Sequence, residues 1–357
     1  MIPVIDISDP SPQTAQQLLS AASTHGFLFI KNDGATIAPT HIASMFTLVR
    51  LPPSPSTLFF LISCQSARYF QQPASQKAAF AIHSSKAGGI NRGWVRMQGE
   101  ALDPSGQQKG DPKEAFNISP PHPDLQPLPE PLSSCSSDIL FFLESCHALC
   151  ARIFALLGTA LDIDAAAGGE TWFSSRHDET QGPSGTIFRM LYYPPTVMRP
   201  ADGNESVRAG AHSDYGSLTL LFRLPGQPGL EMQKPDGTWV PVPVNPSPGT
   251  LDYPPILVNI GDLLSFWTNG MLKSTMHRVT FSGGEERYSM AYFCHPLDHV
   301  RLEPVPSRVI AQFGDGGVRE LEAQRERLAL DMERGGDVLT AKQHLDRRLK
   351  VTYGLKD

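Results

Sequence analysis

The sequence lacks the features that mark several common classes of protein. Its 30 Lys and Arg residues stand against 36 Asp and Glu residues, and no polybasic run occurs, so no field that attracts nucleic acid is expected. The opening MIPVIDISDPSPQ has no basic head followed by an apolar run, and we find no stretch long enough to span a bilayer. These absences predict a cytoplasmic protein with neither nucleic acid nor a membrane as its partner.

Cysteine is also scarce. The five cysteines are odd in number, and none forms a Cys-x-x-Cys pair, so we expect reduced thiols instead of a disulfide framework or a zinc knuckle. The His-Glu-x-x-His motif that is typical of zinc hydrolases is missing as well. Nothing resembles a flexible interdomain linker, which predicts one compact body, and we expect a monomer.

What the chain does contain is a set of possible metal ligands in strand-like sequence. His212 and Asp214 stand two apart in AHSDYGSLTLLF, and side chains two apart on a strand point to the same face. His277 lies in a second such segment, KSTMHRVTF, which turn-prone Asn269-Gly270 and Gly283-Gly284 bound. Two neutral histidines and one carboxylate leave half of an octahedral ion open, and this arrangement is associated with non-haem Fe(II) oxygenases.

A possible carboxylate-binding pair follows the second histidine. Arg287 and Ser289 are again two apart, at a distance suited to the next strand. A guanidinium group grips a carboxylate through two charge-assisted hydrogen bonds, and the hydroxyl group adds a third. The pair therefore predicts that an acidic molecule binds beside the metal.

At these residues, and along nearly the whole chain, the sequence resembles the isopenicillin N synthase-like group of Fe(II)/2-oxoglutarate-dependent dioxygenases. The motifs that carry the resemblance are IPVIDIS, HGFLFIKNDG, GWVRMQGE, DPKEAFNI, LYYPP, HSDYGSLTLL, VNIGDLLSFWTNG, STMHRV and RYSMAYF. The resemblance implies a mainly β fold with flanking helices, in which a jelly roll (double-stranded β-helix) core follows an N-terminal α/β segment. The short strands and regular turns between residues 210 and 296 favour the same fold.

The resemblance also implies a role for each candidate residue. The expected ligands of Fe(II) are His212, Asp214 and His277. The residues expected to bind 2-oxoglutarate are Arg287, Ser289 and Tyr193. With O2, such an enzyme converts 2-oxoglutarate to succinate and CO2 while it hydroxylates, desaturates or cyclises a small organic molecule, and we expect a role in secondary metabolism. No separate catalytic acid or base is expected, because the metal and the cosubstrate carry the chemistry.

Substrate contacts are expected in residues 88–116, a Gly- and Pro-punctuated stretch that matches a family segment lying over the mouth of the active site. The candidates are Arg92, Trp94, Met97 and Phe116. Ordinary loop packing is the alternative for each of them. Leu191 stands where plant relatives often carry Asn, so one polar contact near the cosubstrate is expected to be missing.

We divide this single unit into four segments. They are an N-terminal segment (1–120), a connector with a long helix (121–180), the catalytic jelly roll (181–300) and a helical C-terminal tail (301–357). Apolar periodicity predicts helices over residues 14–24 and 137–161, and we expect the charged tail over residues 319–353 to be helical as well.

Residues 49–65 interrupt the expected helical passage 37–80 with three prolines and an aperiodic apolar patch. The segment begins with Val, whose codons start with GT, and ends with Gln, one of whose codons is CAG. We hypothesise a translated, unspliced intron in a fungal-type gene, and a genuine surface loop is the alternative.

Two other functions are compatible with the same sequence features. An oxidase that draws electrons from its substrate alone, as isopenicillin N synthase does, would carry the same metal ligands and also Arg and Ser, and only the absence of succinate release would separate it. A binding protein that has kept the fold but lost activity is the non-enzymatic alternative, and three intact ligands argue against it.

Overall fold

The computed structural model describes residues 1–32, 34, 36–47, 69–103, 106, 109–195, 207–249, 251, 253–281, 284–317, 322 and 338–354. The segment 49–65, and with it the choice between a retained intron and a surface loop, lies outside the described residues. So does most of the predicted helix 319–353, of which the structure describes the last part.

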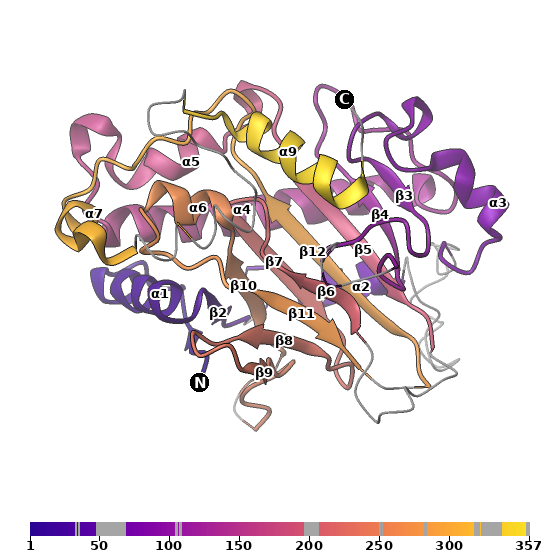
Figure 1. Ribbon diagram of the computed structural model, residues 1–357, viewed down its shortest axis with the longest axis horizontal. Helices are drawn as coiled ribbons and strands as arrows, with labels where there is room; N and C mark the ends of the chain where they lie inside the picture. The colour runs from indigo at the N-terminus through magenta and orange to yellow at the C-terminus, as the bar shows by residue number, and fades with distance from the viewer. Residues whose placement is uncertain are drawn as a thin grey trace.

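Two sheets form the centre of the molecule (Figure 1). The larger has the strand order β1 (Val4–Ile5), β2 (Phe27–Ile30), β10 (Ile256–Ile260), β7 (Leu218–Arg223), β12 (Arg287–Cys294), β5 (Ile187–Tyr193), β4 (Glu114–Ile118) and β3 (Gly93–Val95). The smaller has the order β6 (Val207–His212), β11 (His277–Thr280), β8 (Leu230–Gln233) and β9 (Trp239–Pro241). This is the predicted mainly β architecture with a jelly-roll core.

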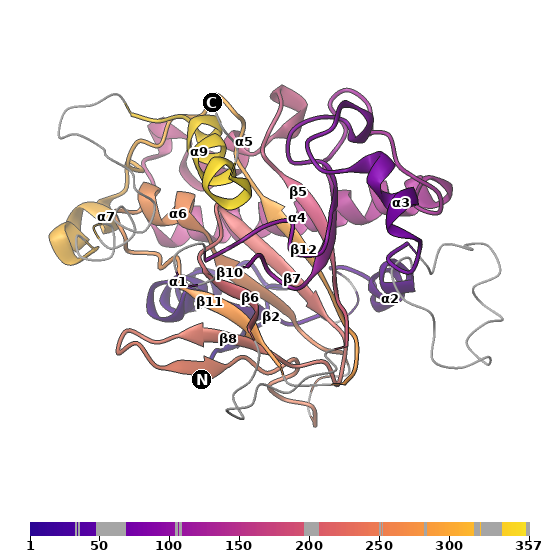
Figure 2. The ribbon, with the colours of Figure 1, turned by 45° about the vertical axis from the view of Figure 1, so that its right-hand side comes forward.

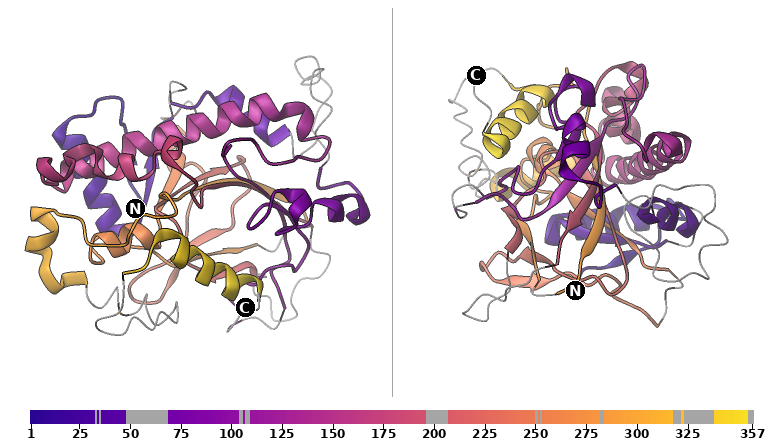
Figure 3. Two further views of the ribbon diagram at one scale, coloured as in Figure 1. Left: turned by 90° about the horizontal axis from the view of Figure 1, so that it is seen from above. Right: turned by 90° about the vertical axis from the view of Figure 1, so that its right-hand side faces the viewer.

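Helices flank the sheets. They are α1 (Pro12–His25), α2 (Pro39–Thr47), α3 (Ala74–Lys77), α4 (Ser136–Ala160), α5 (Trp172–Arg176), α6 (Asp262–Trp267), α7 (Arg308–Phe313) and α9 (Ala341–Tyr353). Short 3-10 turns occupy Ala78–Phe80, Ser85–Ala87, Ser133–Cys135, Ala165–Ala167, Gly169–Thr171, Glu179–Gln181 and Gly314–Gly317. Seen from above, the long magenta helix α4 runs along one side of the strands and the yellow helix α9 along the other (Figure 3). The helices predicted over 14–24 and 137–161 agree with α1 and α4 to within two residues at each end.

Strand alternation divides the larger sheet into two faces. Even-numbered side chains of its central strands belong to the hydrophobic core that includes α1 and α4, where Phe142 of α4 lies 5.3 Å from Phe188 and 5.1 Å from Phe222 between ring centroids. Odd-numbered side chains of the same strands, such as Leu191 and Ala291, pack toward the smaller sheet. Successive side chains of a strand point to opposite faces. One face of the larger sheet therefore packs in the hydrophobic core, while the other faces the smaller sheet.

Two expectations from the sequence need correction here. Residues Ser133–Ala160 are long and apolar enough to span a bilayer by length and composition, although half of the most apolar window is buried against the rest of the protein, as in a core helix. Cys135 is disulfide-bonded, so the expectation of five reduced thiols is wrong for this residue. Cys146, Cys150 and Cys294 are buried and free.

His177 connects the helices on one side of the larger sheet to that sheet. It is buried, with Nδ1 2.7 Å from the carbonyl oxygen of Phe173 in α5 and Nε2 2.8 Å from Oγ of Ser217, which precedes β7. Its ring stacks on Phe154 of α4 with the centroids 4.1 Å apart. Burial lowers the pKa of His177 to about 3, so the folded protein holds it neutral.

We predict that acid destabilises the protein partly through this residue. The unfolded chain protonates a histidine near pH 6.5 but the folded protein does so only near pH 3, so the unfolded state binds more protons as the pH falls. His177 should therefore lower the free energy of unfolding by on the order of 1 kcal/mol between pH 7.5 and pH 5.5. Urea unfolding at both pH values measures this, and the variant His177→Gln should lose less stability over the same interval. Equal losses in the two proteins would contradict the assignment.

Candidate active site

A cavity lies between the two sheets, with α9 along its rim. Odd-numbered residues of β5, β7, β10 and β12 form its floor, and the ends of β6 and β11 form its opposite side. Leu345, Leu349, Thr352 and Tyr353 of α9 complete the wall, and Figure 2 shows this helix above the end of the strands. Most of the lining is apolar, so the polar groups that it does contain stand out.

Three polar side chains converge in this cavity. His212 ends β6 and His277 begins β11, and the two residues pair directly across these antiparallel strands. Asp214 follows His212, and its Oδ1 lies 3.8 Å from Nε2 of His212 and 3.6 Å from Nε2 of His277. One ligand atom from each residue lies within 4.8 Å of the others. The structure thus brings together the three residues that the sequence selected.

Hydrogen bonds orient both imidazoles. The Nδ1–H group of His212 donates to the carbonyl of Gly210 at 2.7 Å, and that of His277 donates to the carbonyl of Thr275 at 3.1 Å. Each Nε2 lone pair is left to face the cavity. Burial, reinforced by the neighbouring His277, lowers the pKa of His212 to about 4, so its imidazole is neutral at pH 7, as a metal ligand must be.

Asp214 is fixed through its other oxygen. Oδ2 accepts hydrogen bonds from Thr219 Oγ1 at 2.6 Å and from Asn259 Nδ2 at 2.7 Å. Burial alone would raise the pKa of the Asp214 carboxyl, but His277, His212 and these two donors outweigh it and hold the pKa below its ordinary value. The residue is therefore an oriented carboxylate. Thr219 and Asn259 lie inside the quoted motifs, yet nothing in the sequence indicated their role.

The donor set fits Fe(II). Two neutral imidazoles and one carboxylate on one side of a small space form the facial triad of non-haem iron oxygenases, with the remaining positions open for ligands. The outer hydrogen bonds that hold all three side chains are those that metal sites require.

Unbalanced positive charge lies at one end of the cavity. Arg287 on β12 is buried, its Nε donates to the carbonyl of Pro228 at 2.9 Å, and its Nη1 lies 3.4 Å from Oγ of Ser289. Arg223 lies opposite Ser289 in the register of β7 and β12, and its guanidinium donates to the carbonyls of Val242 and Pro243. Among the residues that the structure describes, no carboxylate pairs with either arginine.

Burial lowers the pKa of both guanidinium groups, that of Arg223 to about 9 with Arg287 as the second cause. Two buried cations that repel each other form a site that an anion stabilises. Tyr193 lies beside them, with the Arg287 guanidinium 5.0 Å from the centre of its ring. Ser289 and Tyr193 both line the cavity, as does Leu191 in the place where relatives often carry Asn.

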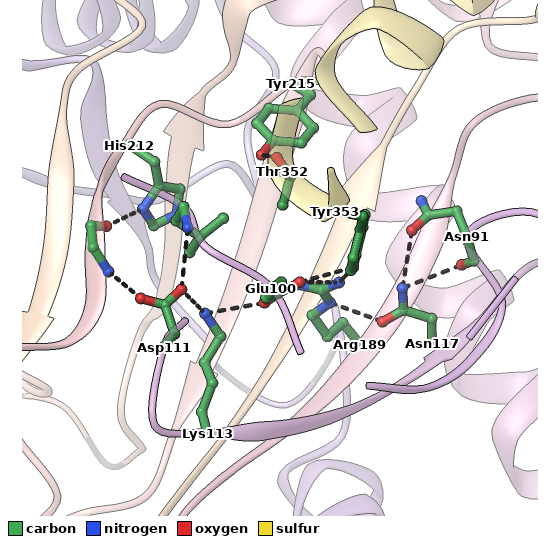
Figure 4. Close-up of polar contacts among 12 residues, drawn as sticks. Asn91, Glu100, Asp111, Lys113, Asn117, Arg189, His212, Tyr215, Thr352 and Tyr353 are labelled. Atoms are coloured by element: carbon green, nitrogen blue, oxygen red, sulfur yellow. Dashed lines mark hydrogen bonds and ion pairs between the residues drawn. The ribbon is translucent and has the colours of Figure 1, made fainter. Parts of the chain in front are cut away.

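The other end of the cavity holds balanced charge (Figure 4). Arg189 on β5 binds Glu100 through two hydrogen bonds of 3.1 and 3.2 Å, and Lys113 contacts the same carboxylate at 3.0 Å. Lys113 also binds Asp111 at 2.7 Å, and Tyr353 of α9 donates to Glu100 at 2.7 Å. Burial alone would raise the pKa of Glu100, but Arg189 and Lys113 hold it below its ordinary value, so the group is charged.

The four predicted substrate contacts lie elsewhere. None of Arg92, Trp94, Met97 and Phe116 lines the cavity. Trp94 and Phe116 pair across β3 and β4 and belong to the core on the α4 side of the sheet, and Trp94 Nε1 donates to Glu114 at 2.7 Å. Arg92 donates to Ser119 Oγ and to the carbonyl of Gly88. The expected region does reach the site, but through Asn91, Glu100 and Lys113.

The fold and the site together define a non-haem iron oxygenase. Residues 184–296 match the model of the 2OG-Fe(II) oxygenase superfamily, a range that includes all three ligand candidates. A UPF0676 protein of Schizosaccharomyces pombe is 30% identical over 99% of this chain and 93% of its own length. The 2-oxoglutarate-dependent dioxygenase htyE of Aspergillus rugulosus is 31% identical over 60% of this chain and 57% of its own.

A solved structure of similar fold is that of a full-length Neurospora crassa protein in complex with alpha-KG, which is 2-oxoglutarate. It is 26% identical, covers 98% of this chain and 95% of its own, and superposes with a TM-score of 0.68. The chain belongs to the 2OG-Fe(II) oxygenase superfamily, and it is an oxidoreductase that uses Fe(II), 2-oxoglutarate and O2. The narrower resemblance to the isopenicillin N synthase-like group stays a prediction.

We predict that Asp214→Ala abolishes tight Fe(II) binding, because it removes the only anionic ligand of the three. Anaerobic calorimetry with Fe(II) measures the affinity. Asn259→Leu, which leaves the carboxylate but removes one of its two donors, should weaken binding by about 10- to 100-fold. Unchanged Fe(II) affinity in a folded Asp214→Ala protein would contradict the ligand assignment.

Proposed function

We propose that this enzyme hydroxylates a small, neutral, carbonyl-bearing molecule and consumes 2-oxoglutarate as it does so. The observation that carries the proposal is the contrast between the two ends of the cavity. At one end Arg287 lines the cavity, with Arg223 close behind it, and neither buried arginine has a carboxylate partner among the described residues, which suits an acidic cosubstrate. The other end holds charges that cancel.

In this proposal His212, Asp214 and His277 hold Fe(II). The metal, with 2-oxoglutarate and O2, supplies the oxidation of a C–H bond when it is bound, and the cosubstrate leaves as succinate and CO2. Arg287 and Ser289 grip the far carboxylate of 2-oxoglutarate. Leu191, Leu221, Leu230 and Val279 line the space between this carboxylate site and the metal and keep water out of it.

At the end of the cavity where the charges cancel, the lining favours a substrate group that is neutral and accepts hydrogen bonds. Asn91 lines the cavity, and its Oδ1 already accepts from Asn117 Nδ2 at 3.0 Å, so its side-chain N–H groups are what it would offer to a substrate. Glu100 already takes hydrogen bonds from Arg189, Lys113 and Tyr353, so it offers little to a substrate donor. A carbonyl oxygen meets donors here, whereas a carboxylate meets no net positive charge.

A relative supports this substrate class. The same Neurospora crassa protein has been crystallised with alpha-KG and thymine, a small neutral ring with two carbonyl groups, and it is 26% identical over 98% of this chain. Desaturation and cyclisation remain open as outcomes of the same oxidation. Secondary metabolism, a cytoplasmic location and a monomeric state stay predictions.

The cosubstrate assignment predicts a specific kinetic defect. Arg287→Gln should raise the KM for 2-oxoglutarate by about 10- to 100-fold, because a charged hydrogen bond contributes about 1.5–3 kcal/mol. Fe(II) affinity should stay near that of the native protein. Succinate formation at varied 2-oxoglutarate concentration measures the change. Substrate turnover and O2 uptake without any succinate would instead favour the oxidase.

The substrate class is tested with a panel of small molecules. With Fe(II), 2-oxoglutarate and O2 present, neutral compounds that carry a ring carbonyl, thymine first, should stimulate succinate formation. Carboxylate analogues of the same size should stimulate it much less. A reversed preference would overturn the substrate class while leaving the cosubstrate assignment intact.

A further inference from the structure

A buried carboxylate outside the metal site is linked to the first metal-ligand candidate through two consecutive hydrogen bonds. Asp111 Oδ1 accepts from the backbone N–H of Gly210 at 2.9 Å. The carbonyl of the same residue accepts from Nδ1–H of His212 at 2.7 Å. Both backbone groups of Gly210 are therefore hydrogen-bonded, the N–H group to Asp111 and the carbonyl group to the His212 imidazole. Figure 4 shows Asp111 and His212 on the same side of the cavity.

Several hydrogen bonds fix the position of Asp111 itself. Its Oδ2 accepts from Lys113 Nζ at 2.7 Å and from the backbone N–H of Leu102 at 3.3 Å. Its backbone N–H donates to Glu100 and its carbonyl accepts from Gln98. The preceding Gly110 allows this close packing, because a Cβ there would lie 2.4 Å from the carbonyl oxygen of Gln98.

Folding alone does not explain this arrangement. Asp111 and Glu100 are buried with Lys113 and Arg189, and burying ions costs several kcal/mol per ion before pairing recovers it. Apolar side chains of similar volume often stabilise a protein equally well or better. What an apolar residue at position 111 cannot do is accept the N–H of Gly210.

We infer that Asp111 is a positioning residue for His212: it fixes the peptide whose carbonyl sets the orientation and tautomer of the ligand imidazole. The inference rests on the proposed role of His212 as a metal ligand. Through Lys113 and Glu100 the same carboxylate is connected to Tyr353, so the imidazole and the C-terminal helix that walls the cavity share one buried hydrogen-bonded network.

The test compares two substitutions of nearly equal size. Asp111→Asn keeps an oxygen that can accept from Gly210, and Asp111→Leu does not. Co(II), which is stable in air, serves as the probe, with calorimetry for affinity and visible absorption for ligand geometry. We expect Asp111→Leu to raise the Co(II) dissociation constant by about 10- to 100-fold and to change the absorption spectrum, and Asp111→Asn to stay within about threefold.

Glu100→Gln is the matched control, because it disturbs the same buried network without touching the bond between Asp111 and Gly210. It should leave Co(II) affinity within about threefold of native. Equal losses in Asp111→Leu and Glu100→Gln, or no difference between the Leu and Asn variants, would overturn the inference. If Asp111→Leu does not fold, the smaller Asp111→Ala replaces it, because it also removes the acceptor of the Gly210 N–H group, and an unchanged Co(II) spectrum and affinity in that variant would also overturn the inference.

His212→Ala separates this inference from the proposed function. If His212→Ala binds Co(II) as tightly as the native protein, the ligand assignment itself fails. If it abolishes binding while Asp111→Leu binds normally, only the positioning role fails.

Discussion

The two oxygens of Asp214 have different partners, and the rest of the site depends on that difference. Thr219 and Asn259 bind Oδ2 from β7 and β10, so the larger sheet fixes the carboxylate. Oδ1 then faces His212 and His277, which the smaller sheet supplies. A site made from two sheets keeps its geometry only if the two sheets are held together, and this buried carboxylate makes that connection at the candidate metal site.

The two ends of the cavity differ in their net charge. Burying a cation without a carboxylate partner is costly, so the pair Arg287 and Arg223 is an unfavourable feature of the protein without ligands. In the proposed function, the acidic cosubstrate relieves this cost. At the other end, Glu100 cancels the charge of Arg189, and only directional hydrogen bonding remains. In the proposed function, this difference in charge would separate the anionic cosubstrate from the neutral substrate within a single mostly apolar space.

Short-range spacing made the metal site predictable. His212 and Asp214 lie two apart, as do Arg287 and Ser289, and strand geometry alone places such pairs on one face. The long helix was equally clear because its apolar stripe repeats over many turns, and the observed α4 differs from the prediction by one residue at each end. Which strands would be neighbours had to come from family resemblance, since no local pattern states it.

The wall of the cavity near Arg189 was not predictable, for two physical reasons. In β3 and β4 the sequence gives no clear alternation, and a shift of one residue moves a side chain to the opposite face. Trp94 and Phe116 thus joined the core, while Val95 and Ala115 face the smaller sheet. In addition, Glu100 and Lys113 stand in a Gly- and Pro-rich stretch where charged residues are normally exposed. Their burial depends on Arg189 and Tyr353, which are distant in sequence, so the wall exists only after three separate parts of the chain have packed together.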